Sequence, residues 1–170
     1  MQSKTKRLLT KFLKWRYRNI SNKTFVHVMS LLVGLAAGLV AVTLKNLTYL
    51  IQSVLKAGII FSENQLYFVL PIVGLALVFL YVKFVHKEPL QHAVSSIIFS
   101  LSKKKGLLRV KDIYTPLIAA PLTVGFGGSV GLLGPAVKSG SALSSNLSQL
   151  FHIDAKTRSL LVACASAGAI

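Results

Sequence analysis

Apolar runs separated by short charged segments organise most of the chain. The first lies between Lys23 and Lys45, where TFVHVMSLLVGLAAGLVAVTL has 21 residues without a Lys, Arg, Asp or Glu. As an α-helix it would measure about 31 Å, enough to cross the hydrocarbon core of a bilayer. A second run of 17 residues, Leu66–Val82, carries Pro71 near its start, where a kink is tolerated. The pattern therefore predicts two membrane-spanning helices, the second of which returns to the side where the first began.

After Glu88 the apolar segments become short or interrupted. HAVSSIIFSLS, from His92 to Ser102, is apolar but too short to cross a bilayer, so it is expected to enter and come back. A longer uncharged stretch, Ile113–Val137, is divided by prolines and glycines, namely Pro116, Pro121, the glycine cluster and Pro135. Broken helices are tolerated in a bilayer only where protein or a water-filled cavity surrounds them. We therefore predict an all-α, polytopic membrane protein with tilted spanning helices and broken or re-entrant half-helices.

Composition and charge agree with a membrane protein and orient it. Hydrophobic residues make up 53% of the 170, and 20 Lys and Arg face four acids, for a net charge of +16. Eight basic residues lie between Lys4 and Lys23, and seven more flank the later apolar runs: Lys83, Lys87, Lys103, Lys104, Lys105, Arg109 and Lys111. By the positive-inside rule, these flanks and the N-terminus belong in the cytoplasm of a multi-pass protein of the cell membrane, beside anionic lipid.

The chain divides into two parts by this reading. Residues 1–22 form a predicted basic interfacial helix, in which apolar side chains lie near one face: Leu8, Leu9, Phe12, Leu13 and Trp15. Residues 23–170 form the transmembrane domain. A nucleic-acid-binding arm is the rival interpretation of residues 1–22, but a spanning helix follows directly, so we expect the lipid bilayer as partner and no nucleic acid.

The segment GFGGSVGLLGPAVKSG, Gly125–Gly140, holds six glycines and a proline where a spanning helix should avoid both. Gly127 and Gly128 would let the backbone approach a small ligand, and Gly131 and Gly134 would permit turn geometry. Pro135 suits the first turn of a helix that starts there. Such a helix would present free N–H groups at membrane depth, and a small anion is their natural partner.

The glycines allow two other interpretations. They could serve only close helix packing, as Gly34 and Gly38 in GLAAG are expected to do. A soluble phosphate-binding loop is disfavoured because GLLGPAV lacks the Lys-Ser/Thr pair that such a loop needs.

The remaining polar residues indicate no enzyme, cofactor or metal site. The four acids form no catalytic constellation, and the four histidines are scattered: His27, His86, His92 and His152. Cys164 is the single cysteine, so an internal disulfide is excluded. Asp154 is expected to cap a helix that begins around Ala155.

GSVGLLGPAVKSG resembles the signature of the chloride channel (CLC) family, G-[KR]-E-G-P followed by x-V-x-x-G, between two half-helices. The matching positions are Gly131, Gly134, Pro135, Val137 and Gly140. The family also has an upstream G-S-G-I-P, in which some bacterial members carry histidine in place of serine. The corresponding residue is His92 in QHAVS, 41 residues before Leu133, although Gln91, Ala93 and Ser95 depart from that pattern. Downstream, SLLVACASAGAI resembles the family's small-residue helix.

This resemblance implies an anion site built from specific residues. Ser129 and the backbone N–H groups of Ala136 and Val137 would form its outer half, at the helix shaped by Gly131, Gly134 and Pro135. His92 would be an inner donor, although a lone histidine on an apolar helix is more often structural. Lys138 would add positive potential or extend to the interface.

The position of the family's gating glutamate is occupied by Leu133. Leucine has no ionisable group, so we predict passive transport of a small anion, chloride by analogy, with no proton coupling.

The resemblance covers the first of the family's two inverted repeats and implies a homodimer for a full-length member. A half-built pathway would leave backbone polar groups facing lipid, so the 170-residue polypeptide by itself is expected not to conduct. The alternative function is a non-conducting, truncated or degenerate membrane protein with a role in assembly or lipid contact.

Overall fold

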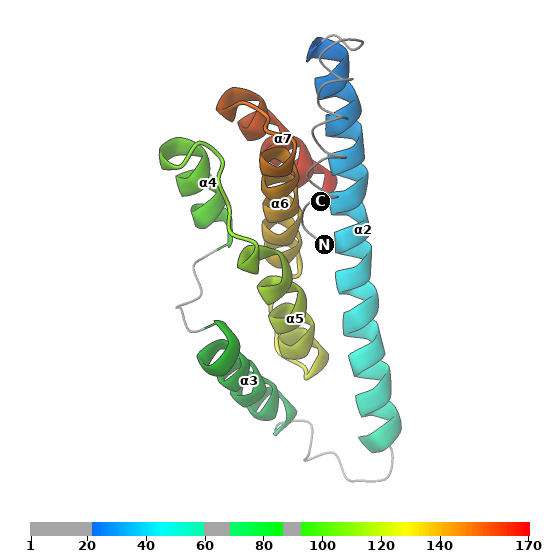
Figure 1. Cartoon of the computed structure of the whole chain (residues 1–170). Helices are drawn as coiled ribbons and strands as arrows, with labels where there is room; N and C mark the ends of the chain where they lie inside the picture. The colour runs from blue at the N-terminus through cyan, green and yellow to red at the C-terminus, as the bar shows by residue number, and fades with distance from the viewer. Residues whose placement is uncertain (1–21, 60–68, 87–92) are drawn as a thin grey trace, which may run out of the picture.

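A computed structural model of the chain describes residues 22–59, 69–86 and 93–170 (Figure 1). These residues form α-helices and no strand, which confirms the predicted all-α class. The elements are α2 (Asn22–Ile59), α3 (Leu70–Tyr81) with a π-helical turn η2 (Val82–His86), α4 (Ala93–Lys103), α5 (Lys111–Gly125), α6 (Leu133–Leu150) and α7 (Ala155–Gly168). The predicted interfacial helix within residues 1–22 lies outside the described residues, apart from Asn22.

The first predicted span forms the N-terminal half of α2, which has 38 residues. Its segment Thr24–Ala57 is the one helix among the described residues that is long and apolar enough to cross a membrane. The helix continues beyond Lys45, where the uncharged run ends, because no glycine or proline follows for three turns and the apolar residues continue. At about 1.5 Å per residue α2 is longer than a bilayer core of about 30 Å is thick, so α2 must tilt or extend beyond the core.

The second predicted span is described only from Val69 onward. There α3 begins at Leu70, so Pro71 lies in the first turn. A proline in the first turn removes an N–H group that has no intrahelical acceptor, and it introduces no kink there. Residues 60–68, which include Glu63 and the start of the predicted span, lie outside the described part of the chain.

Pro116 and Pro121 do not divide the uncharged stretch Ile113–Val137 as predicted. Both lie inside α5, which runs unbroken from Lys111 to Gly125, and both are buried. A membrane helix accommodates an interior proline when neighbouring helices surround the freed carbonyl. Within Ile113–Val137, the helical structure is interrupted only between Phe126 and Leu132.

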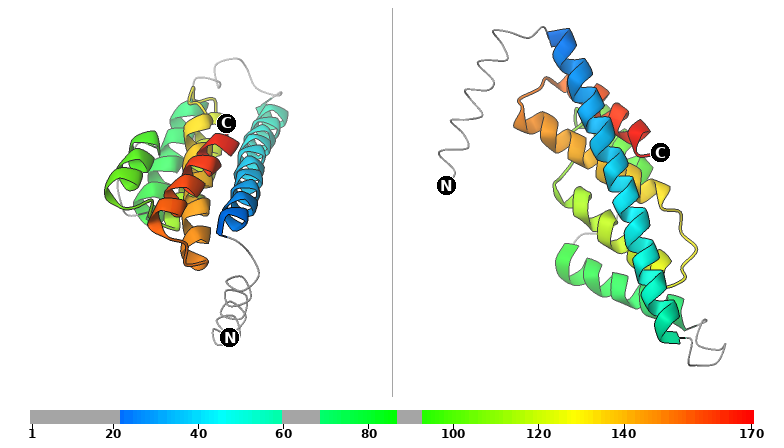
Figure 2. Two further views of the ribbon diagram at one scale, coloured as in Figure 1. Left: turned by 90° about the horizontal axis from the view of Figure 1, so that it is seen from above. Right: turned by 90° about the vertical axis from the view of Figure 1, so that its right-hand side faces the viewer.

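The core of the bundle is α6, which contacts α2, α4, α5 and α7, whereas α3 packs on α5 (Figures 1 and 2). The buried face of α6 is made of small residues. Its fully buried serines are Ser139, Ser141, Ser144, Ser145 and Ser148. Small side chains let helix backbones approach closely, which drives association in a lipid environment.

Glycines make the closest of these contacts between α2 and α7. A Cβ atom at Gly168 would lie 2.8 Å from the carbonyl oxygen of Gly34, and one at Gly38 would lie 3.3 Å from that of Gly168. The predicted packing role of GLAAG is therefore confirmed.

Asp154 caps α7, as predicted. Its carboxylate accepts a hydrogen bond from the backbone N–H of Thr157 at 3.2 Å. Hydrogen bonds from the side chain and backbone of Thr157 hold the pKa of Asp154 below its ordinary value because they favour the charged form.

Removing this cap is expected to cost about 1 kcal/mol in the Asp154→Ala variant at neutral pH. A lowered pKa means that the carboxylate's contribution is complete above about pH 4 and is lost as the pH falls through the folded-state pKa. Reversible unfolding in detergent at pH 7 and pH 3 measures this difference. Asp154→Asn, a non-titrating cap, should stay near the wild-type stability at pH 7. An acid-induced loss of equal size in wild type and Asp154→Ala would contradict the assignment.

Candidate functional site

The glycine cluster ends α5 with a defined hydrogen-bonded turn. Gly127 has a φ of +91°, a left-handed conformation that glycine adopts without strain. Its N–H donates to the carbonyl of Val124 at 3.0 Å, and the N–H of Gly128 donates to that of Thr123 at 2.9 Å. This pair of bonds is the Schellman motif, which closes a helix C-terminus.

The other glycines in the cluster differ from Gly127 in their geometry. A Cβ atom at Gly128 would lie 2.7 Å from the carbonyl oxygen of Thr123, so the turn requires glycine at this position. Gly131 and Gly134 have no left-handed φ, and Gly134 lies within α6. The first part of the cluster therefore terminates a helix.

The second part of the cluster starts a new helix, α6, at Leu133, two residues before the predicted start at Pro135. The N–H of Ala136 donates to the carbonyl of Leu132 at 3.0 Å, so it already belongs to the helical ladder. Val137, one residue further into the helix, has the carbonyl of Leu133 as its intrahelical acceptor. The N–H groups of Leu132, Leu133 and Gly134 precede the ladder and have no acceptor among the described residues. The open donors of α6 therefore lie nearly a turn earlier than predicted.

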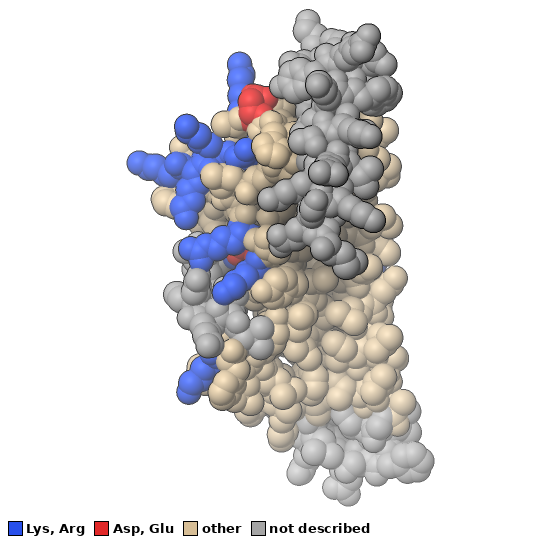
Figure 3. Space-filling model, in the orientation of Figure 1, with Lys and Arg blue, Asp and Glu red and all other residues tan. Residues whose placement is uncertain are grey.

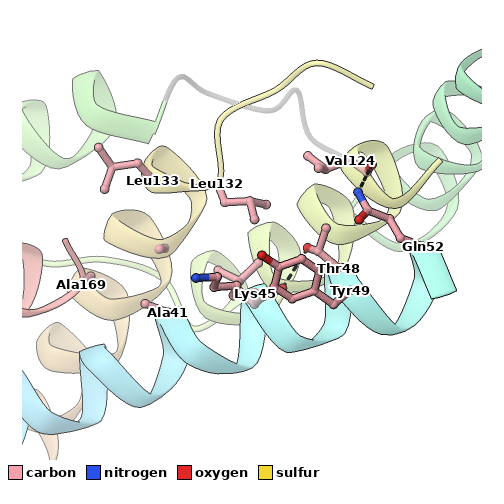
Figure 4. Close-up of a pocket in the computed structure, with 11 residues that line it drawn as sticks. Ala41, Lys45, Thr48, Tyr49, Gln52, Val124, Leu132, Leu133 and Ala169 are labelled. Atoms are coloured by element: carbon pink, nitrogen blue, oxygen red, sulfur yellow. Dashed lines mark hydrogen bonds between the residues drawn. The ribbon is translucent and has the colours of Figure 1, made fainter. Parts of the chain in front are cut away.

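A pocket of about 400 Å³ adjoins this helix start (Figure 4). Its walls are α2, the end of α5, the first turn of α6 and the end of the described chain. The lining residues are Ala41, Leu44, Lys45, Thr48, Tyr49, Gln52, Val124, Leu132, Leu133, Ala136 and Ala169. It is a mainly apolar space with a few polar groups, which is typical of small-ligand sites.

Polar groups enter the pocket from one face of α2. Lys45, Thr48, Tyr49 and Gln52 recur at the three- and four-residue spacing of a single helix face. Two of them are held in place, since Thr48 donates to the carbonyl of Leu44 at 2.9 Å and Gln52 to that of Val124 at 3.4 Å. The side chains of Lys45 and Tyr49 project from α2 toward Leu132 (Figure 4).

Lys45 carries the one charge among the described residues that line the pocket. Its ammonium lies 6.0 Å from the centre of the Tyr49 ring, and neither acid of the described residues, Asp112 or Asp154, pairs with it. A cation inside an apolar span is costly and usually marks an ion path or a binding site. Sequence reasoning treated Lys45 as the end of a span, although the polar spacing that it begins was a readable signal.

A comparison with known protein families shows to which family the chain belongs. The family described as voltage gated chloride channel matches residues 73–170, from α3 to α7. The chain belongs to the voltage-gated chloride channel family. No curated protein and no solved structure matches the chain. The match includes the whole connection between α5 and α6.

Membership of the voltage-gated chloride channel family confirms the resemblance inferred from the signature at Gly131–Gly140. It makes the chain a member of a membrane protein family of channels and transporters, and places it in ion transport, chloride transport in particular. The all-α helices and the apolar span of α2 agree with that family.

Within this chloride channel framework, the structure brings some of the predicted site residues together and separates others. Leu133 is 54% exposed and lines the pocket with Ala136, which is buried. Ser129 and Gly131 are exposed in the connection outside the lining, and Val137 packs against the core. Gly134 and Pro135 lie in the first turn of α6. His92 lies outside the described residues, so its role stays a prediction.

Lys138 has a different role from either one predicted. Its ammonium forms an ion pair with Asp112 at 3.4 Å, and the two side chains are only 7% and 19% exposed. Asp112 also accepts from the backbone N–H of Arg109 at 3.3 Å. The pair therefore joins α6 to the start of α5, and Lys138 is not among the residues that line the pocket.

Proposed function

We propose that this chain forms part of a passive pathway for a small anion, with chloride as the ion, at the N-terminus of α6. The observation that carries the proposal is the meeting of the open N–H groups of Leu132, Leu133 and Gly134 with the pocket that Lys45 lines. A helix N-terminus presents partial positive charge, and a lysine adds a full charge to it. Chloride, in preference to other small anions, rests on family membership.

The pathway is proposed to be uncoupled from protons. Proton coupling needs a group that gains and loses a proton near pH 7, and the described residues of the lining include no carboxylate or histidine. Leu133 stands at the position where the family signature has its glutamate, and leucine cannot titrate. An anion can therefore move here without an exchange of protons.

The orientation and assembly belong to the same proposal. Basic residues before the first apolar run and after the second favour a cytoplasmic N-terminus and a multi-pass arrangement in the cell membrane. A homodimer follows from the family analogy.

Lys45→Met is expected to reduce anion flux about tenfold or more, because the pocket would lose its one full positive charge. The measurement is chloride efflux from vesicles that contain the protein as purified from its native membrane, with a potassium ionophore to balance charge. A pH-sensitive dye in the same vesicles records proton movement, which should be absent. Lys56→Met is the matched control, since Lys56 lies on the same helix outside the pocket.

Two outcomes would overturn parts of this proposal. Uphill proton movement driven by a chloride gradient would refute the uncoupled mechanism. Vesicles that show no anion flux above protein-free vesicles would refute conduction and favour the alternative, a non-conducting protein with a role in assembly or lipid contact. Equal flux in Lys45→Met and wild type would remove Lys45 from the pathway and leave the N-terminus of α6 as its remaining element.

A further inference from the structure

Basic side chains gather along one side of the bundle, and none of them lines the pocket (Figure 3). They come from the end of α4, the connection between α4 and α5, the start of α5 and the first turn of α7, and all are exposed. We call this set the basic rim: Lys103, Lys104, Lys105, Arg109, Lys111 and Lys156. The connection and α7 lie together, since a Cβ atom at Gly106 would be 3.4 Å from the hydroxyl of Ser159.

The rim is held in shape by buried hydrogen bonds. The hydroxyl of Ser145 on α6 donates to the carbonyl of Gly106 at 2.6 Å and accepts from the N–H of Leu108 at 2.9 Å. Lys105 and Gly106 both have left-handed φ values, 52° and 73°, and the N–H of Gly106 donates to the carbonyl of Ser100 at 2.9 Å. A preformed backbone binds a partner without the entropic cost of ordering a loop.

The two acids among the described residues, Asp112 and Asp154, have other roles. Asp112 is paired with Lys138, and Asp154 caps α7. Neither of them forms an ion pair with a lysine of the rim. The five lysines of the rim, on one side of the described molecule, therefore create a field that attracts anions.

Apolar side chains lie among these charges. Leu107 is 43% exposed and Val110 is 59% exposed, between the lysines of the connection and Lys111 at the start of α5. On α4, Phe99 is 52% exposed, and the ammonium of Lys104 lies 5.7 Å from the centre of its ring. Leu108, by contrast, is buried against α6 and anchors the segment. An aqueous polyanion such as a nucleic acid would leave these exposed apolar groups without a partner.

We propose that the basic rim binds the phosphate groups of anionic phospholipids at the membrane surface. Leu107 and Val110 enter the acyl boundary, while the lysine stems lie along the apolar surface and their ammonium groups reach the phosphates. Each lysine near an anionic surface contributes about 1 kcal/mol of attraction. The rim thereby ties the starts of α5 and α7 to the bilayer surface, and this inference does not depend on anion conduction.

The test uses tryptophan fluorescence from the rim. Leu107→Trp in a Trp15→Phe chain places the one indole of the protein among the lysines. The protein is reconstituted into bilayers that contain brominated phosphatidylglycerol or brominated phosphatidylcholine, and the quenching gives their relative binding constant. We expect a preference of ~5-fold or more for phosphatidylglycerol, and a loss of that preference in Lys104→Gln/Lys105→Gln. Lys56→Gln/Lys83→Gln removes the same charge elsewhere and should keep the preference.

The opposing outcomes are distinct. Equal quenching by the two lipids, or an unchanged preference in Lys104→Gln/Lys105→Gln, would overturn the proposal. Displacement of the lipid by millimolar inorganic phosphate or by an RNA oligonucleotide would show that the rim takes a soluble anion instead. A salt series on the reporter chain, without further substitutions, keeps the test valid if the double variant fails to fold. The preference must then fall between low and high salt, and a salt-independent preference would also overturn the proposal.

Discussion

The Lys138→Met variant is expected to lose about 3 kcal/mol of its free energy of unfolding. Lys138 forms an ion pair with Asp112 across the contact between α5 and α6, at 3.4 Å. Without it, the carboxylate stays in an environment where it is only 19% exposed and retains the N–H of Arg109 as a donor. A buried charge that loses its counter-charge costs far more than the pair contributed while intact. Denaturant unfolding in mild detergent, followed by circular dichroism, measures the loss.

A second substitution distinguishes an ion pair from simple packing. The double variant Lys138→Met/Asp112→Asn removes both charges, and we expect it to recover most of the lost stability, since neutral partners of similar size replace a buried pair at little cost. If the double variant were as unstable as Lys138→Met, the loss would come from packing around the lysine stem. An unfolding midpoint of Lys138→Met equal to that of the wild type would contradict the pairing itself.

Gly168→Ala is expected to destabilise the protein by about 1 to 3 kcal/mol, even though alanine favours a helix more than glycine does. The new methyl carbon would lie 2.8 Å from the carbonyl oxygen and 2.9 Å from the Cα atom of Gly34. Both are backbone atoms, which cannot move aside as the end of a flexible side chain can, so α2 and α7 must separate. The same unfolding assay measures the effect.

The control for Gly168→Ala is the glycine on the other side of the contact. A Cβ atom at Gly34 would meet no heavy atom within 4 Å, so Gly34→Ala should leave stability unchanged or slightly raised. Two glycines in the same contact are thus expected to differ in sign. Equal destabilisation in both variants would mean that the contact depends on backbone flexibility and not on the close approach at Gly168.

These two predictions describe how the bundle is held together. Between helices in lipid there is little hydrophobic driving force, so close contacts of small residues and polar pairs supply the association. The serine face of α6 and the glycines of α2 and α7 supply the close contacts, and the pair of Lys138 with Asp112 supplies the polar pair.

Local features of the fold could be predicted because neighbouring residues determine them. The cap at Asp154 depends on an N–H group three residues away, and the end of α5 depends on a left-handed glycine at its C-terminus. The prolines of α5 were misjudged because their cost depends on what surrounds the helix. Pro116 and Pro121 are buried among other helices, and a sequence pattern does not show that enclosure.

The candidate site could be predicted only in part, because some of its features depend on neighbouring residues and others on the packing of helices. The break before α6 was readable from glycine and proline, but its open N–H groups belong to Leu132, Leu133 and Gly134 because the helix starts two residues early. The partner of Lys138 could not be predicted, since Asp112 lies on another helix and the sequence pattern does not show which residues of two helices face each other.

The sequence by itself determined that this is an all-helical membrane protein, that its uncharged stretch Ile113–Val137 is interrupted, and that the interruption carries a chloride channel signature. Apolar length, glycine and proline act within a few residues, so they can be read along the chain. Only the tertiary structure decided that Lys45 of α2 lines a pocket at the start of α6 and that Lys138 is neutralised by Asp112. Whether a lysine is paired or left to attract an anion depends on which helix faces it, and the packing of small residues between helices sets that arrangement.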